Sequence, residues 1–507
     1  MHGKAKEESE IANEKEVVET SAVRATGKSK RGNIEMKVLQ DELDKMTGSG
    51  KTEAYDVGEE FEILFKDSNR YYTVDKDGNV GDVKIVEKDT YPGDITKGLD
   101  GKLLDGSEEN PYEINCIEDL VALSNITNGE GYKIEDGKMI QITSENPLSG
   151  KYVVLRKTLN FKSPLSYTDC NRTDFGDING NTEDGNKLIT ELTTGNGFKP
   201  IGASESRSFE GNFNGLDNKI EEIYINRQNM QVGLFSKISA VNYKIKIQNL
   251  GVSGKINVSG DGGSAGGIAG WITSTGNSTN IEIVNCYNLA DITVNAKGSA
   301  GGIVGWGKVV SAVIKNCYNL GNITGNNIGT MEGVGGIYGF AYSPVIFKNC
   351  YNLGNVTSDN PVGGIVGHSY QAVDFLNCYN LGNYLRGGST VGGISGNDGW
   401  TTHNYINCYN MAIKMEGTNI GGLSGSSPKK DYIIIKNCYY DKNLAQNGVH
   451  NWTEVAGNGL ERVEINSVET VKKLNDYIER GIENEEGIDT SDWKKWKVGE
   501  EGYPIFE

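Results

Sequence analysis

The sequence has little proline and no long apolar run. Proline supplies 9 of the 507 residues and glycine 68, a balance that excludes collagen, which needs abundant proline and a strict three-residue glycine period. No apolar stretch approaches the roughly 20 residues of a membrane-spanning helix. The hydrophilic start, MHGKAKEESE, is no signal peptide, so we expect any export signal or membrane anchor to lie in a segment absent from this chain.

Positive charge and histidine are also scarce. The formal net charge is −18, and lysine and arginine form no cluster of the kind that binds phosphate backbones. We therefore expect no nucleic-acid partner. Only four histidines are present and no HExxH motif occurs, so the sequence predicts no metal, no cofactor and no catalytic residue.

What the sequence has in excess is repetition. Six segments between residues 284 and 443 centre on an Asn-Cys-Tyr word, as in KNCYNLGNIT (315–324). Successive cysteines are 31, 33, 28, 30 and 30 residues apart. A second word, Gly-Gly-apolar-X-Gly, keeps the same period and begins at Gly266, Gly301, Gly335, Gly363, Gly392 and Gly421. Two words that share one period indicate a solenoid.

The segments between these words favour a parallel β-helix. They are short and rich in Val, Ile, Phe and Tyr, and the turns are built of Gly, Asn, Ser and Asp. One repeat of about 30 residues would form one coil that buries its inward side chains against its neighbours. At about 4.8 Å per coil, residues 106–460 would form roughly a dozen coils and a rod of about 55 Å.

The repeated cysteines are predicted to form an internal column. A large apolar residue precedes each cysteine by three positions, and both can face inward only if the chain bends between them, for which Asn is suited. Asn316, Asn349 and Asn377 would then stack beside the cysteines. A row of disulfides or of metal sites along the coils is the alternative. However, parallel Cβ vectors suit disulfides poorly, and metal sites need clustered cysteines. The predicted structural ladder comprises Cys286, Cys317, Cys350, Cys378, Cys408 and Cys438.

The position after the glycine word predicts a candidate ligand site. It is occupied in successive repeats by Trp271, Trp306, Phe340, His368, Asn397 and Ser426. One interpretation is an aromatic ladder that covers the edge of the core. The other is an exposed platform for sugar rings, which Trp400 would extend. The candidate ligand-binding residues are therefore Trp271, Trp306, Phe340, His368 and Trp400.

The repeated words resemble the GLUG motif, a bacterial repeat of surface proteins that include large secreted peptidases of the IgA-protease type. The resemblance is strongest over residues 266–445. It implies a right-handed parallel β-helix at the cell surface. It implies no catalytic residues, because the chemistry of the large peptidases lies in a separate domain.

The first hundred residues show a different resemblance. Two amphipathic helical segments, within residues 6–29 and over 33–46, are followed by strand-like segments 59–65 and 70–74. This order is similar to Firmicute prepilin-like proteins after their hydrophobic N-terminal segment. It implies contact with other pilus-like subunits through the N-terminal helix.

Two alternatives for chemistry are weaker. DINGNTEDGN (177–186) and DKDGNVGD (75–82) suggest calcium loops, but the first lacks the glycine and glutamate that an EF-hand needs, so both favour turns. A polysaccharide lyase or hydrolase on a β-helix is the enzymatic alternative. The arginines are scattered and no paired aspartate cluster repeats, which disfavours it.

These observations predict a mainly β protein in three parts. Residues 1–105 would form a small pilin-like α+β domain, 106–460 the parallel β-helix, and 461–507 a C-terminal cap with a helix over 467–482 closing the open end. We expect an extracellular, non-enzymatic adhesin or minor pilus-like subunit that binds a glycan or a host or matrix protein. A purely structural spacer is the alternative.

Overall fold

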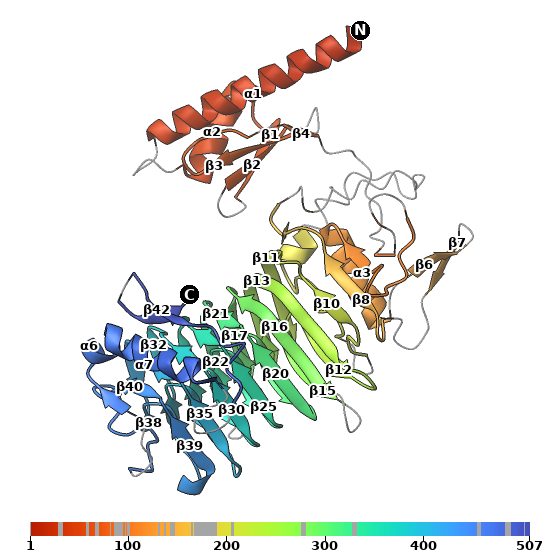
Figure 1. The fold of residues 1–507 in the computed structure, drawn as a ribbon. Coiled ribbons are helices and arrows are strands. Elements are labelled where there is room, and N and C mark those ends of the chain that lie inside the picture. Colours follow the sequence, from red (N-terminus) through yellow and green to blue (C-terminus); the bar gives the residue numbers. More distant parts are fainter. Residues whose placement is uncertain are drawn as a thin grey trace.

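The computed structural model describes residues 2–28, 34–56, 60–65, 70–81, 83–85, 95–96, 98, 102–129, 132–135, 138–141, 148–163, 166, 190–203, 207–274, 280–326, 332–453, 458–481, 488–500 and 502–507. An N-terminal unit of helices and a small sheet precedes a long stack of strands, and the C-terminal elements lie beside the end of that stack (Figure 1).

The N-terminal unit contains the predicted helices and strands. Helices α1 (His2–Lys28) and α2 (Met36–Thr47) accompany an antiparallel sheet of β1 (Thr52–Asp56), β2 (Glu60–Phe65), β3 (Arg70–Asp75) and β4 (Lys84–Ile85). Val18, Ala22 and Ala25 recur on one face of α1 and are fully buried in the core of this unit. Among the described residues, no helix has the length and apolar character needed to cross a membrane.

The prediction of a parallel β-helix is confirmed. The strands align between coils in five columns of parallel pairs, and in each column the repeated words lie in register. The column before the cysteines contains β13 (Ile245–Gly260), β16 (Asn280–Asn288), β20 (Ser311–Lys315), β25 (Val345–Lys348), β30 (Val373–Leu376), β35 (His403–Ile406) and β39 (Ile433–Lys436). The next contains β21 (Tyr318–Asn319), β26 (Tyr351–Asn352), β31 (Tyr379–Asn380), β36 (Tyr409–Asn410) and β40 (Tyr439–Asp441).

The other three columns complete each coil. One contains β17 (Asp291–Ala296), β22 (Ile323–Asn326), β27 (Val356–Ser358), β32 (Tyr384–Arg386) and β37 (Lys414–Glu416). The glycine words form β14 (Ala265–Gly266), β18 (Ala300–Gly301), β23 (Val334–Gly335), β28 (Val362–Gly363), β33 (Thr390–Gly392) and β38 (Asn419–Gly421). After them come β12 (Phe235–Ala240), β15 (Ala269–Ser274), β19 (Val304–Lys308), β24 (Tyr338–Ala341), β29 (Val366–Ser369) and β34 (Ser395–Asn397).

The predicted bend lies at the asparagine before each cysteine. Asn316 has φ of 54° and Asn349 of 52°, in the left-handed region that asparagine tolerates better than most residues. The turn reverses the alternation of the strand, so Ile314 and Cys317 both face inward and are both fully buried. The same backbone conformation recurs at Asn249, Asn285, Asn377, Asn407 and Asn437.

The predicted number of coils is too high. The solenoid has about seven turns rather than a dozen. The number of coils is lower because some residues before the regular repeats form other elements. These are helix α3 (Ile117–Asn128) and the hairpin of β6 (Tyr132–Glu135) and β7 (Lys138–Gln141), which add no coil. The first coils contain β5 (Tyr112–Ile114), β8 (Tyr152–Leu155), β9 (Leu159–Asn160), β10 (Asn212–Asn214) and β11 (Lys219–Gln228).

The C-terminal segment packs on the side of the last coils rather than only across their open end. It comprises β41 (Asn458–Leu460), α6 (Arg462–Ile465), α7 (Val468–Glu479), β42 (Trp496–Val498) and β43 (Pro504–Phe506). Trp493 and Trp496 are buried there, in a cluster with the coil residues Tyr379 and Tyr409. Val468, the first residue of α7, is 75% exposed, because it lies one turn before the buried stripe.

Candidate functional site

The aromatic column lies in register on one face of the solenoid. Trp271 pairs with Trp306, Trp306 with Phe340, and Phe340 with His368 on successive parallel strands. Lys237 precedes Trp271 in this column and Asn397 follows His368. The five side chains that follow Lys237 thus occupy one row along the coil axis, as their shared position in the repeat requires.

The rings of this column differ in exposure and do not form one flat platform. Trp271 and Trp306 are half-buried and meet edge to face, with ring centroids 5.3 Å apart and an angle of 74° between the planes. Phe340 and His368 are only 5% and 6% exposed, with centroids 4.9 Å apart. The two tryptophans therefore present partly accessible rings, whereas Phe340 and His368 mainly fill space.

A second aromatic row lies beside the first and was missed by the sequence analysis. Tyr342 and Tyr370 stack in parallel, with centroids 5.1 Å apart and an angle of 6°, and Tyr370 is 39% exposed. The Tyr342 ring is 6.1 Å from that of Trp306. Both tyrosines stand two positions after the first column, and because strand side chains alternate, this spacing places them on the same face. The same two-residue spacing in GFAY and GHSY could have revealed this second row in the sequence.

Cationic side chains lie over these rings. The Lys237 ammonium is 4.7 Å from the Trp271 ring centroid, and the Lys308 ammonium is 5.3 Å from that of Tyr342. We call Lys237, Trp271, Trp306, Lys308, Tyr342 and Tyr370 the aromatic face. Trp400 is 64% exposed in the loop between β34 and β35, where the preceding Gly399 packs on the Tyr370 backbone.

The six repeated cysteines are buried free thiols, one in each of six successive coils. Each donates a hydrogen bond to a backbone carbonyl, as in Cys317 Sγ to the oxygen of Lys315 at 3.3 Å. Burial raises the pKa of the Cys317, Cys378 and Cys438 thiols. All six side chains are 0% exposed, and an inaccessible thiol is a poor nucleophile and a poor metal ligand, so this column has the properties of packing.

Two asparagine ladders run along the same coils. In the outer ladder, the amide of each corner asparagine donates to the side-chain oxygen of the one before it, at 2.6–2.9 Å; its members are Asn249, Asn285, Asn316, Asn349, Asn377, Asn407 and Asn437. The inner ladder is fully buried and bonds in the opposite direction at 2.7–2.9 Å; its members are Asn288, Asn319, Asn352, Asn380 and Asn410. The sequence analysis anticipated only the outer one.

The C-terminal segment binds the outer ladder directly. The Trp496 indole donates to the Asn377 side-chain oxygen at 2.7 Å, and the Asn377 amide donates to the backbone oxygen of Lys494 at 2.9 Å. The Asp492 carboxylate pairs with Lys315 at 2.8 Å and Lys348 at 3.0 Å. The segment is therefore held by polar contacts to several coils as well as by its apolar core.

A serine, a histidine and an aspartate meet inside the last coils. Ser369 Oγ is 2.8 Å from His403 Nε2, and Asp398 accepts hydrogen bonds from Tyr405 at 2.7 Å and Ser424 at 2.6 Å. His403 Nδ1 lies 2.7 Å from the Thr401 carbonyl, so Nδ1 carries the proton and Nε2 accepts from Ser369.

Within the part of the chain that the structure describes, this cluster is closed to solvent. The side chains of Asp398 and His403 are 0% exposed, and Ser369 is equally buried. Asp398 lies 4.0 Å from Nε2, on the side where a nucleophilic serine is activated, whereas a triad carboxylate orients the histidine through Nδ1. The cluster satisfies buried polar groups rather than forming a nucleophile with its base.

The calcium-like segment at residues 75–82 contains a turn where it is described. The Asp75 carboxylate accepts the backbone N–H groups of Asp77 at 3.0 Å and Asn79 at 2.8 Å, which is the side-chain pattern of a local turn. The other segment, 177–186, lies outside the described residues.

Comparison with known proteins gives one match of fold. No protein-family model matches the sequence, and no curated protein matches it. A solved structure of "a putative immunoglobulin A1 protease from Bacteroides ovatus" is 16% identical, with a TM-score of 0.45 over 80% of this chain and 95% of that chain. The resemblances to GLUG and prepilin-like proteins are not shown by these comparisons and stay predictions.

The match corrects one prediction. The expectation that the chain is not an enzyme is contradicted, because the matched protein is named "a putative immunoglobulin A1 protease". At this identity and TM-score, the likeness assigns no reaction, substrate or partner to the chain.

Proposed function

We propose that the protein is an exported bacterial cell-surface protein whose β-helix binds a glycan through the aromatic face. The observation that carries the proposal is the pair of adjoining aromatic rows, Trp271–Trp306 and Tyr342–Tyr370, which keep accessible rings on neighbouring coils. Sugar rings pack their apolar faces on such side chains, while nearby lysine and asparagine groups reach hydroxyls.

Two further observations support export and surface display. Cys116 is disulfide-bonded, and disulfides persist mainly in oxidising compartments outside the cytosol. The repeated words resemble those of bacterial surface proteins. The buried repeat thiols fit the same setting, because their burial protects them from oxidation.

The test is a glycan array with the wild-type protein and two variants of the aromatic face. Tyr370→Ala removes an exposed ring at the end of the second row, and Trp306→Ala removes the ring that contacts both rows. We expect reproducible hits whose affinity falls about tenfold or more in each variant, the equivalent of about 1.4 kcal/mol.

A matched control is Tyr384→Ala. Tyr384 lies on strand β32, in another column, and also has a lysine, Lys414, over its ring at 5.3 Å. Its removal should leave glycan binding unchanged. If a broad array gives no hit, the side chains of the aromatic face serve only to pack against one another, and the protein is a surface spacer. If hits persist in both variants, the ligand binds elsewhere on the protein.

A further inference from the structure

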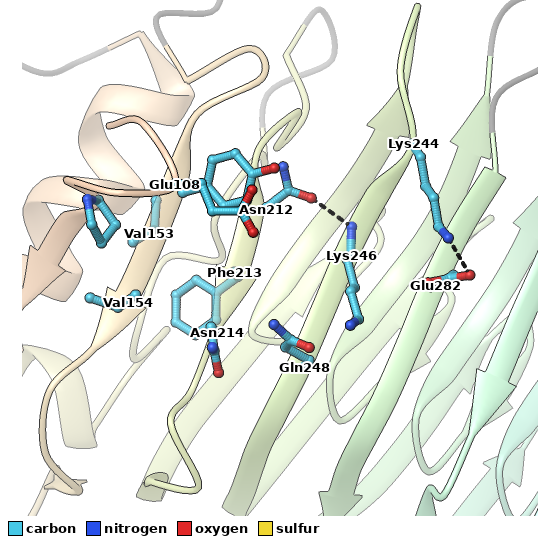
Figure 2. A pocket seen from close by; sticks show the side chains of 12 residues that line it. Glu108, Val153, Val154, Asn212, Phe213, Asn214, Lys244, Lys246, Gln248 and Glu282 are labelled. Carbon is cyan, nitrogen blue, oxygen red and sulfur yellow. Dashed lines mark hydrogen bonds and ion pairs between the residues drawn. The ribbon is translucent and has the colours of Figure 1, made fainter. Parts of the chain in front are cut away.

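A cavity of about 380 Å³ opens on the outer surface of the first coils, on a different sheet from the aromatic face. Figure 2 shows its wall, to which strands β8, β10, β13 and β16 contribute side chains. Its size falls within the range of small-molecule sites, roughly 300–1,000 Å³.

Strand register arranges the outward side chains of the cavity in two rows. Tyr152 pairs with Asn212, Asn212 lies opposite Lys246, and Lys246 pairs with Glu282. The second row runs through Val154, Asn214 and Gln248. One end of the wall is therefore apolar, with Tyr152 and Val154, and its centre is made of amides and an ammonium group.

The centre of the wall offers hydrogen-bond donors. Asn212 Oδ1 already accepts the Lys246 backbone N–H at 2.9 Å, and Asn214 Oδ1 accepts the Leu216 backbone N–H at 2.9 Å. Among the residues that the structure describes, each amide keeps its NH₂ group for another partner. Lys244 is neutralised by Glu282 at 2.5 Å. Within the described part of the chain, the Lys246 ammonium has no ion pair.

We infer that this cavity binds a saccharide that carries a single carboxylate, of the uronic acid class. The carboxylate would pair with the Lys246 ammonium, and the amides of Asn212, Asn214 and Gln248 would bind oxygens of the ring. Tyr152 and Val154 would contact its apolar face. Glu108 also lines the cavity, and together with the net charge of −18 it disfavours a polyanion.

The test uses isothermal titration calorimetry of the full chain with an aldobiouronic acid and with its methyl ester. The two disaccharides have the same rings and differ in the charge that Lys246 would bind. We expect the acid to bind at least tenfold more tightly than the ester. Lys246→Met should reduce the affinity for the acid to that of the ester and leave the ester unchanged.

Lys255→Met is the matched control, because Lys255 is an exposed lysine on the same strand, β13, outside the cavity. It should bind both disaccharides as the wild type does. Gln248→Ala is the second cavity variant and should weaken the acid and the ester equally. Equal binding of the acid and the ester, no binding at millimolar concentration, or an equal loss in Lys255→Met would overturn the inference.

The two proposals can fail separately. Tyr370→Ala, on the aromatic face, should not change binding of the aldobiouronic acid, because Tyr370 follows β29, which belongs to another sheet. A loss in this variant would mean that the acid binds the aromatic face and not the cavity.

Discussion

Gly302 lies against the side chain of Asn319, so closely that a methyl group on Gly302 would come within 2.6 Å of the Asn319 side-chain carbon. The same methyl group would be 2.2 Å from the backbone oxygen of Gly336 in the next coil. The two repeated words of the sequence therefore meet inside the solenoid. The second glycine of one word leaves the space that the inner asparagine of the other fills.

Replacing Gly302 by alanine is expected to destabilise the protein by about 1–3 kcal/mol, the usual cost of overpacking a rigid interior. The reason is that the clash involves backbone as well as a hydrogen-bonded side chain, and neither yields easily. Urea denaturation followed by circular dichroism measures the effect. Gly27→Ala is the control, because a Cβ at Gly27 meets no atom within 4 Å, and it should leave the midpoint unchanged or slightly raised.

The inner asparagine ladder predicts a large effect of a nearly isosteric change. Asn319 donates to Asn352 Oδ1 at 2.8 Å and to the Gly321 backbone oxygen at 2.8 Å, both fully buried. Asn319→Asp keeps the shape but removes both donors, so we expect a loss of stability of about 2–4 kcal/mol.

The control for this change is Asn326→Asp. Asn326 makes an analogous bond to Asn295 at 2.8 Å, but at an exposed position, where water replaces the lost partner. Its expected cost is about 0.5 kcal/mol or less. Similar urea midpoints for Asn319→Asp and Asn326→Asp would show that the inner ladder adds little to stability.

The period and the corners of the solenoid could be read from the sequence, because both depend on local chemistry. Asn316 forms its corner through its own left-handed backbone conformation alone. Trp271 and Trp306 share a face because the repeated segments that contain them share one period. The inner ladder could not be read in this way. Asn319 resembles a turn residue until its partner, 33 positions away, is known. The side-on docking of Trp496 depends on Asn377, 119 residues earlier, and no local pattern encodes it.

The buried thiols predict resistance to alkylation. Burial raises the pKa of the Cys317 thiol and also blocks access to it, so the reactive thiolate is not available in the folded protein. Iodoacetamide at neutral pH should leave the six repeat cysteines unmodified for hours in the native state. In denaturant, intact mass should show all six modified. Rapid native labelling, or fewer than six reactive thiols after unfolding, would contradict the buried free column.

The tyrosine stack predicts a loss of stability at alkaline pH. Tyr287 stacks in parallel on Tyr318, with centroids 4.8 Å apart, and burial followed by the Tyr318 charge raises the pKa of Tyr287 to about 12. The ordinary value in an unfolded chain is about 10. Between these values the folded state keeps a proton that the unfolded state has released, so the free energy of unfolding falls as pH rises.

Urea denaturation at several pH values between about 9 and 12 tests this sign, because the slope of stability against pH reports the difference in bound protons. If tyrosine ionisation alone is considered, the free energy of unfolding of the wild type should be constant below about pH 10 and decline above it. Tyr287→Phe removes the proton but keeps the ring stack, so its decline should be shallower while its stability at neutral pH stays close to the wild type. An unchanged slope in Tyr287→Phe would mean that this hydroxyl titrates alike in both states and that the stack does not hold it protonated.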